Sequence, residues 1–330
     1  MQPALIFFPI IPISDTLNIM STEEKRNQNL MNIIKKMHGF MESDDLEKQR
    51  QSQEHFAKFS LAPKGLNIEE VSFAGIYGEW LRPSRPHDAR HVILYCHGGG
   101  YMTGSSAYSR NVTCKLAEAA SMDVFCFNYG LAPENKYPSQ LNEAMEAWNY
   151  LMLKGYGAKD IILVGDSAGG NLALALSLRL KQENRMLPLA LCLYSPWTDM
   201  TASGRSYKTK KNLDPVLTYE YIKQASSRYL MGTVDNICEE EYSRLINDPS
   251  VSPLFGDFTG FPPVYIQVGT NEILYSDSEM LYKKLLSAGV TARLEAFKGM
   301  WHVFQMTPLK TAAEAIDKTA EFIFKLLLFN

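Results

Sequence analysis

An apolar run followed at once by a serine between two glycines constrains this chain more than any other segment. Residues 161–164 are Ile-Ile-Leu-Val, residues 165–169 are Gly-Asp-Ser-Ala-Gly, and a helical pattern follows from 171 to 180. A strand that turns sharply into a helix in this way lifts the serine hydroxyl clear of the sheet. A side chain at either glycine would clash where strand and helix approach each other. Ser167 is therefore the candidate nucleophile, although a tight glycine turn in any α/β protein would give the same five residues.

The composition fits a folded globular protein with a sizeable core. The chain has 330 residues, of which 46% are hydrophobic and 21% charged, as in ordinary soluble domains. The formal net charge is -3, and the lysines and arginines are scattered. We expect no binding to nucleic acid or to an anionic membrane, because both need a concentrated positive field.

The five cysteines lack the spacing of a metal site. Their number is odd, no Cys-x-x-Cys pair occurs, and Cys96, Cys126 and Cys192 lie in apolar runs. A thiol in such a run acts as a small hydrophobic group. We therefore predict free cysteines, no metal and a reducing, cytoplasmic compartment.

The apolar start of the chain is not expected to be a signal peptide or a membrane span. Residues 4–13 are apolar, but they include two prolines and are too few to span a bilayer. No basic residue precedes them, so the positive start of a signal peptide is missing. Ser21-x-x-Glu24 forms a capping box directly after Met20. We predict that residues 1–19 are an upstream extension and that Met20 is the natural start.

A helical segment precedes the main domain. Across residues 20–62, apolar side chains such as Leu30, Ile33 and Met37 recur on one face at helical spacing. This face needs a packing partner. The segment is either a lid over the main domain or a helix packed on its outer surface.

Alternating strands and helices then place residues 63–330 in the α/β class. The expected strands are residues 68–73, 76–81, 91–96, 124–129, 161–164, 189–194, 264–268 and 293–297. The expected helices are residues 109–120, 139–153, 170–181 and 276–288. This alternation predicts a mostly parallel eight-stranded sheet with helices on both faces. The first two strands are joined too tightly for a parallel crossover, so we expect them to be antiparallel.

One region, at about residues 200–247, interrupts the alternation. It holds no convincing core strand, and its residues 218–231 form an aromatic-rich helical pattern. We interpret it as an insertion after the sixth strand. Insertions there lie over the carboxyl ends of the strands, where α/β sheets bind ligands.

A run of glycines follows the third strand. His97-Gly98-Gly99-Gly100 comes directly after the apolar run that ends at Cys96. Consecutive glycines expose backbone N–H groups that can stabilise the negative oxygen formed when a hydroxyl attacks a carbonyl. A flexible glycine turn is the alternative, but the position upstream of Gly-x-Ser-x-Gly argues against it.

A base and an acid can be assigned by their positions after the last two strands. His302 follows the last strand, and an imidazole suits the removal of a serine proton near neutral pH. Glu272 follows the penultimate strand, where a carboxylate can orient that imidazole. Asp277 is the second candidate acid, although its charge also suits the start of the next helix.

The other five histidines fit different roles. His97 is expected to brace the glycine loop. The remaining four are expected to be solvated and structural: His38, His55, His87 and His91.

Taken together, these motifs resemble the hormone-sensitive lipase family of α/β-hydrolases, close to its bacterial esterases. The matching segments are residues 97–100 (HGGG), 129–134 (YGLAPE), 165–170 (GDSAGG), 195–199 (SPWTD) and 248–253 (DPSVSP), with the regions of Glu272 and His302. The order Ser167, Glu272, His302 is also that of α/β-hydrolases. The resemblance covers the chain from about residue 66 onward.

The resemblance implies further roles. The N–H groups of Gly99, Gly100 and Ala168 would form the oxyanion hole, with Gly98 a less favoured member. Residues 20–62 and the insertion would form a cap. The family usually has arginine where this chain has Gly130, which implies a local packing change, and more often has aspartate where Glu272 stands.

The function expected from these residues is that of a serine ester hydrolase acting on small-molecule esters with short to medium acyl chains. No cofactor is expected, because neither glycine loop has dinucleotide-binding spacing. Alternatives are an amide or lactone hydrolase on the same fold, or a receptor-like binding module without catalysis. Relatives that pair through the edge strand suggest a homodimer by analogy.

Overall fold

The structure, a computed structural model, describes residues 25, 29–32, 45–59, 65–232 and 238–329. The extension expected at residues 1–19 lies outside these residues, as does much of the helical segment expected at residues 20–62. Within that segment the longest described helix is α2 (Leu46–Phe59).

An eight-stranded sheet forms the centre of the molecule, with the strand order β1-β2-β4-β3-β5-β6-β7-β8. Its strands are β1 (Leu66–Phe73), β2 (Ile76–Pro83), β3 (Asp88–Cys96), β4 (Met122–Phe127), β5 (Ile161–Asp166), β6 (Ala190–Tyr194), β7 (Val264–Gly269) and β8 (Ala292–Phe297). The pairs β1/β2 and β2/β4 are antiparallel and all others are parallel. The predicted fold class, including the antiparallel first pair, is therefore confirmed.

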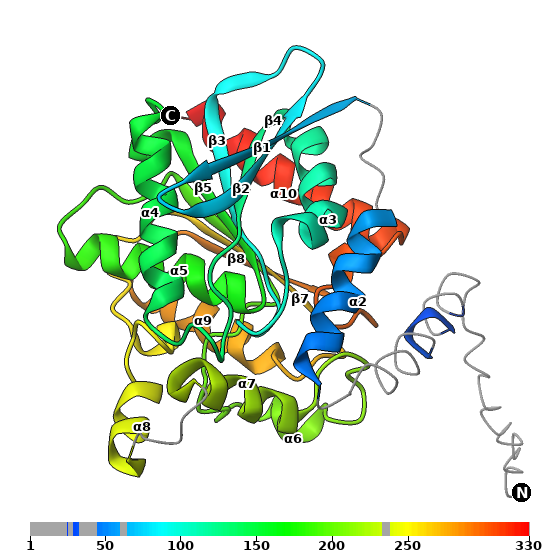
Figure 1. The fold of residues 1–330 in the computed structure, drawn as a ribbon, viewed down its shortest axis with the longest axis vertical. Coiled ribbons are helices and arrows are strands. Elements are labelled where there is room, and N and C mark those ends of the chain that lie inside the picture. Colours follow the sequence, from blue (N-terminus) through cyan, green and yellow to red (C-terminus); the bar gives the residue numbers. More distant parts are fainter. Residues whose placement is uncertain (1–24, 26–28, 33–44, 60–64, 233–237, 330) are drawn as a thin grey trace, which may run out of the picture.

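Helices cover both faces of this sheet (Figure 1). After α2, the helices of the described chain are α3 (Ser106–Ala120), α4 (Ser139–Leu153), α5 (Ala168–Gln182), α6 (Ser206–Thr209), α7 (Tyr219–Met231), α8 (Glu239–Ile246), α9 (Tyr275–Ser287) and α10 (Lys310–Phe329). Short 3-10 turns lie at Ala158–Asp160, Pro253–Phe255 and Phe304–Met306. Helices α3 and α10 pack on one face, and α4, α5 and α9 contribute to the core on the other. Because both faces are covered, central strands such as β5 are buried at every residue.

Successive residues of a strand enter different halves of the core. Val92 and Leu94 of β3 belong to the core on the side of α5, whereas Ile93 and Tyr95 belong to the core on the side of α3 and α10. This is the period of two that a pleated strand imposes. The expected strands differ from the observed ones only at their ends. Helix α10 was not predicted, although Ile316, Ala320 and Ile323 have helical spacing and are buried.

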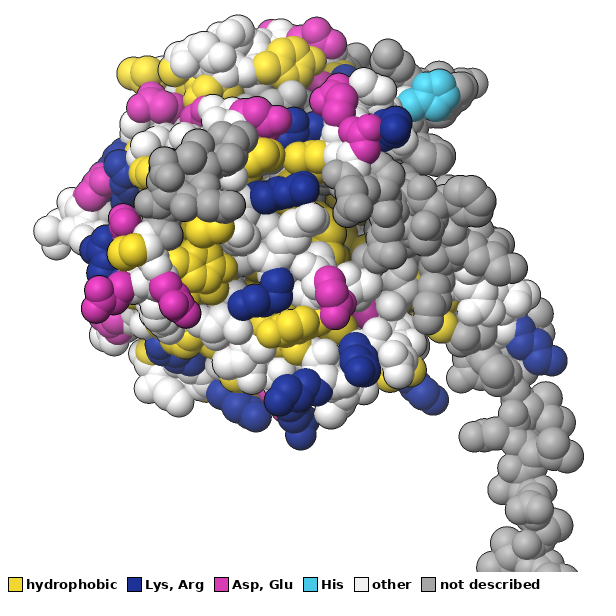
Figure 2. All heavy atoms as spheres, turned by 60° about the horizontal axis from the view of Figure 1, so that its bottom comes forward, with side chains coloured by type: hydrophobic (Ala, Val, Ile, Leu, Met, Phe, Trp, Pro, Cys, Tyr) yellow, Lys and Arg dark blue, Asp and Glu magenta, His cyan; other side chains and the backbone are white. Residues whose placement is uncertain are grey.

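The insertion between β6 and β7 carries α6, α7 and α8, which lie together at one end of the sheet (Figure 1). Helix α7 agrees with the aromatic-rich helix expected at residues 218–231, and Thr218 caps it by accepting a hydrogen bond from the N–H of Tyr221 at 3.1 Å. Side chains of both charge signs and apolar side chains are interspersed on this end of the molecule (Figure 2).

Three further features of the described chain concern its cysteines, its helices and its groups of possible metal ligands. All five cysteines are free thiols, and only Cys238 is exposed. In the described part of the chain, no helix combines the length and the apolar character needed to cross a bilayer. No three His, Cys, Asp or Glu side chains of the described residues gather closely enough to hold a metal ion.

Candidate active site

Ser167 lies on the sharp turn between β5 and α5. Its φ is +54°, in the left-handed region that non-glycine residues rarely adopt. The backbone is closely packed at this turn. A Cβ on Gly169 would lie 2.0 Å from the carbonyl oxygen of Cys96, and a Cβ on Gly165 would lie 2.4 Å from the carbonyl oxygen of Gly169. Both flanking residues must therefore be glycine, as the sequence indicated.

The structure brings Ser167, His302 and Glu272 into contact. The Nε2 atom of His302 lies 2.9 Å from Oγ of Ser167, and its Nδ1 atom lies 2.9 Å from Oε2 of Glu272. The three residues follow β5, β8 and β7, so the carboxyl ends of parallel strands supply all of them. Each side chain is buried, with Glu272 fully inaccessible and Ser167 8% exposed.

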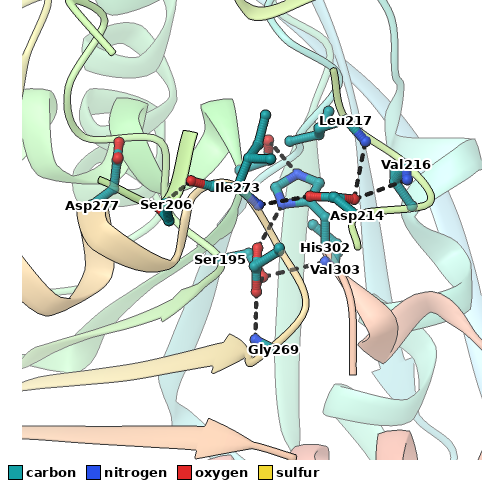
Figure 3. A network of polar contacts seen from close by, with 12 residues as sticks. Ser195, Ser206, Asp214, Val216, Leu217, Gly269, Ile273, Asp277, His302 and Val303 are labelled. Carbon is teal, nitrogen blue, oxygen red and sulfur yellow. Dashed lines mark hydrogen bonds and ion pairs between the residues drawn. The ribbon is translucent and has the colours of Figure 1, made fainter. Parts of the chain in front are cut away.

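The second oxygen of Glu272 is held by its surroundings. Oε1 accepts hydrogen bonds from Oγ of Ser195, at 2.9 Å, and from the N–H of Gly269. Oγ of Ser195 in turn accepts a hydrogen bond from the N–H of Val303 at 3.2 Å. Figure 3 shows Ser195 beside the loop of His302 and Val303, with a dashed line to the N–H of Val303. Sequence reasoning noted Ser195 only as part of the SPWTD segment and did not assign it to the site.

Asp214 is a second residue that sequence reasoning missed. It comes from the insertion, and its carboxylate accepts hydrogen bonds from the N–H groups of Val216, Leu217 and Ile273 at 2.9, 3.0 and 2.9 Å. It therefore ties the insertion to the loop that carries Glu272. Burial raises the pKa of Asp214 to about 6, against the opposing effect of nearby His302.

The charges around His302 favour its protonated form. Burial lowers the pKa of this imidazole, but the hydrogen bond and charge of Glu272 outweigh burial, helped by the charges of Asp214 and Asp166. The net pKa of His302 is raised above its usual 6.5. A histidine in this setting is a stronger base toward the serine proton than a free imidazole.

Asp277, the alternative acid, lies in a different network. Its Oδ2 atom accepts hydrogen bonds from the N–H groups of Thr198 and Asp199 at 2.9 and 3.0 Å. In Figure 3 its carboxylate points away from the imidazole of His302. Burial, reinforced by the charge of Asp199, raises the pKa of Asp277 well above its usual value.

The glycine loop lies beside the serine, and its N–H groups have different partners. The N–H of Gly98 donates to Oδ1 of Asp166 at 3.0 Å, so this N–H is already used in a hydrogen bond within the protein. The N–H groups of Gly99, Gly100 and Ala168 have no acceptor among the described residues. Ala168 is the first residue of α5, where an N–H has no partner within the helix. These three donors are the ones assigned to an oxyanion hole above.

His97 braces this loop from inside. Its Nδ1 atom lies 2.8 Å from the carbonyl oxygen of Gly98, and its ring stacks on Tyr129 at a centroid distance of 4.0 Å. Burial lowers the pKa of His97 to about 4. The ring is therefore neutral near pH 7.

Two of the other histidines differ from the expectation. His87 and His91 were expected to be solvated, but Nε2 of His87 lies 2.8 Å from Asp123 and Nδ1 of His91 lies 2.6 Å from Asp88, with both rings mostly buried. Each ring gains a carboxylate partner that a polar loop sequence does not reveal. His55 is exposed on α2, and His38 lies outside the described residues.

Gly130 is the position at which the resemblance implied a local packing change. Its N–H donates to Glu143 and its carbonyl oxygen accepts from Nε2 of Gln140 at 2.7 Å. A Cβ there would lie 2.8 Å from Cγ of Asn135. The expected packing change is thus local: the neighbouring side chains close the space that a larger residue would need.

Comparisons with known proteins identify the family of this chain. Residues 93–306 match the family model described as an alpha/beta hydrolase fold. An esterase of Acinetobacter venetianus is 36% identical over 259 residues, which cover 78% of this chain and 82% of that protein. An acetyl-hydrolase of Streptomyces hygroscopicus is 33% identical over 253 residues, covering 77% and 79% of the two chains.

Solved structures are similar over almost the whole chain. The crystal structure of an esterase from the bacterial hormone-sensitive lipase family has a TM-score of 0.82 at 30% identity, covering 93% of this chain and 99% of that one. A hormone-sensitive lipase from a metagenome library has a TM-score of 0.83 at 27% identity, covering 91% and 98%. The protein is thus an α/β-hydrolase. It belongs to the hormone-sensitive lipase family and is a carboxylic ester hydrolase.

Proposed function

We propose that this protein is a serine carboxylesterase in which Ser167, His302 and Glu272 form the catalytic triad. The observation that carries the proposal is the unbroken chain of contacts from Oγ of Ser167 through both ring nitrogens of His302 to Glu272. Beside Oγ, the N–H groups of Gly99, Gly100 and Ala168 supply donors without another partner among the described residues.

In the acylation half, Oγ of Ser167 attacks the ester carbonyl carbon while Nε2 of His302 takes the hydroxyl proton. The carbonyl oxygen becomes negative, and the three N–H groups stabilise it. Glu272 holds the imidazole in the required tautomer and stabilises its protonated form. When the tetrahedral intermediate collapses, His302 gives its proton to the departing alcohol and Ser167 carries the acyl group.

In the deacylation half, water repeats the same steps. His302 removes a proton from water, the hydroxide attacks the acyl carbon, and the second tetrahedral intermediate collapses. The proton returns to Oγ of Ser167, and the carboxylic acid leaves. All groups needed for both halves come from the chain itself.

We further propose that α2 and the insertion form a cap that limits the acyl chain to short and medium lengths. The hydroxyl of Tyr221, on α7, would lie only 2.7 Å from a Cβ placed on Gly100, so the insertion reaches the proposed oxyanion hole. One relative is named an acetyl-hydrolase, and one similar solved structure is that of an esterase soaked with p-nitrophenyl butyrate. These names support a preference for small acyl groups.

The test compares the parent protein with Ser167→Ala on p-nitrophenyl esters from acetate to palmitate, beside an aryl amide and a lactone. We expect a burst of p-nitrophenol and fluorophosphonate labelling from the parent protein only, with the highest kcat/KM between acetate and octanoate. Parent-like turnover by Ser167→Ala would refute the nucleophile. A preference for the amide or lactone would instead support the alternative hydrolases, and an unlabelled, inactive parent protein would support the binding module.

A further inference from the structure

The carbonyl oxygen of Gly99 is unusually well supplied with hydrogen bonds. It accepts from the N–H groups of Met102 and Thr103, both at 3.0 Å, and from Oγ1 of Thr103 at 3.1 Å. This carbonyl belongs to the peptide whose N–H is that of Gly100. Whatever binds the carbonyl therefore acts on a proposed oxyanion donor at the other end of the same peptide.

Helix α2 contacts Thr103 through the side chain of Gln53, while Arg50 of the same helix donates to the carbonyl oxygen of Met102 at 2.8 Å. Nε2 of Gln53 lies 3.2 Å from Oγ1 of Thr103, and Oε1 of Gln53 accepts from the N–H of Gly104 at 2.9 Å. A backbone N–H can only donate, so it fixes the amide oxygen on Gly104 and turns the amide NH₂ toward Thr103.

The direction of the Thr103 hydroxyl follows from this arrangement. A hydroxyl has one proton to donate, and its oxygen already accepts from the Gln53 amide. Among the residues that the structure describes, the acceptor assigned to this hydroxyl is the carbonyl oxygen of Gly99, at 3.1 Å. The proton of Thr103 is thereby directed at the Gly99–Gly100 peptide.

Hydrogen bonds to a peptide carbonyl increase the polarity of the N–H in the same peptide, because linked hydrogen bonds polarise one another. They also fix the rotation of the peptide plane, which sets where the N–H points. The Tyr221 hydroxyl, at 3.5 Å from the same carbonyl, is too distant to replace the Thr103 bond.

We propose that Thr103 and Gln53 are positioning residues for the oxyanion hole: Gln53 orients the hydroxyl of Thr103, and Thr103 polarises and aligns the peptide whose Gly100 N–H receives the developing negative charge. The inference rests on the proposed serine esterase function. It links the helical segment before the main domain to catalysis through one relay of hydrogen bonds.

Other contacts of α2 offer a matched control. Oε1 of Glu54, the next residue, accepts a hydrogen bond from Oγ of Ser105 at 2.7 Å, on the same loop as Thr103. Ser105 caps the N-terminus of α3 and has no contact with the Gly99 carbonyl. Glu54→Gln therefore weakens the contact between α2 and Ser105, but it leaves the hydrogen bonds from Gln53 to Thr103 and from Thr103 to Gly99 in place.

The experiment uses Thr103→Val, Gln53→Glu, the double variant and Glu54→Gln. Valine keeps the shape of threonine but has no hydroxyl. A glutamate at position 53 still accepts from Gly104, but its carboxylate has no NH₂ and attracts the Thr103 proton away from Gly99. Three quantities are measured for each protein: kcat and KM on p-nitrophenyl butyrate, the affinity for an alkyl trifluoromethyl ketone, and the thermal unfolding midpoint. Oγ of Ser167 adds to the carbonyl carbon of the ketone while His302 takes the hydroxyl proton. The former carbonyl oxygen of the resulting hemiketal is negative and occupies the proposed oxyanion hole.

We expect each single variant of the relay to lower kcat about 3- to 30-fold, below the roughly 100-fold cost of losing a whole oxyanion donor. KM should change less than about twofold, because the bond matters most when charge develops. Affinity for the trifluoromethyl ketone should fall by the same factor as kcat. The double variant should lose no more than Thr103→Val alone, since both act through one hydroxyl. Glu54→Gln should match the parent protein in kcat and ketone affinity.

Two results would overturn the inference while leaving the esterase assignment intact. One is parent-like kcat and ketone affinity in Thr103→Val. The other is a loss in Gln53→Glu that persists in full when Thr103 is already valine. If the parent protein itself forms no ketone adduct, the proposed function fails first. A lowered unfolding midpoint with unchanged kcat would assign Thr103 a structural role only.

Discussion

The hydroxyl of Ser195 joins the acid and the base loops of the site. It donates to Oε1 of Glu272 across 2.9 Å and accepts from the N–H of Val303, the residue after His302, at 3.2 Å. Oε1 is the oxygen that His302 does not use. Ser195 thus fixes the rotation of the carboxylate and the position of the histidine loop at the same time.

Ser195→Ala should lower kcat about tenfold and the free energy of unfolding by about 1–2 kcal/mol. Both follow because the variant leaves the buried N–H of Val303 without its acceptor and leaves Oε1 of Glu272 with only the N–H of Gly269 as donor. Ser177→Ala is the control, since this serine is also fully buried and donates to the carbonyl of Ala173, on α5. The control should leave kcat unchanged and should cost less stability, because it leaves no buried N–H without an acceptor and alanine suits a helix interior. A kcat loss of equal size in both variants would contradict a specific role for Ser195.

Glu272→Gln and Asp277→Asn should separate the two candidate acids. Replacing the acid partner of a triad histidine costs roughly 10³- to 10⁴-fold in kcat, because the amide no longer holds the correct tautomer. We expect a loss of that order for Glu272→Gln. Asp277→Asn should keep kcat within about threefold, since an amide oxygen can still accept from the N–H groups of Thr198 and Asp199. Steady-state kinetics on p-nitrophenyl butyrate decide the matter, and equal losses would remove the basis for choosing Glu272.

The acid limb of the pH profile should report the raised pKa of His302. The base must be neutral to take the Ser167 proton, so kcat/KM is full above the pKa of His302 and falls as the pH drops through it. Since Glu272, Asp214 and Asp166 raise that pKa above 6.5 despite burial, the midpoint of the limb should lie above pH 6.5. A profile of kcat/KM from pH 5 to 9 measures it. A midpoint below 6.5 would mean that burial outweighs the three carboxylates.

Asp214→Asn should move this limb to lower pH. The change removes a negative charge that favours protonated His302, so less alkaline conditions suffice to keep the ring neutral. It also sets an amide NH₂ against the N–H of Ile273, so we expect some loss of stability. Asp277→Asn is the control, because it removes a buried carboxylate outside the His302 network. An identical shift in both variants would show that the effect is not specific to Asp214.

The sequence allowed the fold to be predicted and Ser167, Glu272 and His302 to be proposed as site residues, because these inferences depend on short runs of residues and on positions just after strands. The apolar run before Gly165 and the glycines around Ser167 lie within ten residues of one another. Glu272 and His302 were found because parallel strands bring their carboxyl ends to one edge, so position after a strand predicts position in space.

Ser195 and Asp214 could not be predicted in the same way. Ser195 contacts Glu272, which is 77 positions away, and Asp214 contacts Ile273, which is 59 positions away. Neither contact leaves a periodic pattern, since each depends on how an irregular loop folds over a neighbour. His87 was misjudged for a similar reason, because its partner Asp123 lies 36 positions away on β4, whereas His91 was misjudged because the strand β3 begins at Asp88 and holds both His91 and its partner Asp88.

Gly169→Ala should be among the most damaging single-atom additions in the chain. The new Cβ would lie 2.0 Å from the carbonyl oxygen of Cys96 and 2.5 Å from that of His97, so α5 and the end of β3 would have to separate. Both ends of the site move with them, since α5 begins beside Ser167 and β3 leads into the glycine loop. We expect a loss of more than about 3 kcal/mol in the free energy of unfolding, as for overpacking against rigid backbone. Gly289→Ala is the control: its φ is +76° but nothing lies within 4 Å of the new atom, so only backbone strain of about 1 kcal/mol should appear. Urea unfolding of both variants gives the two values, and near-equal losses would show that the contact between strand and helix tolerates a methyl group.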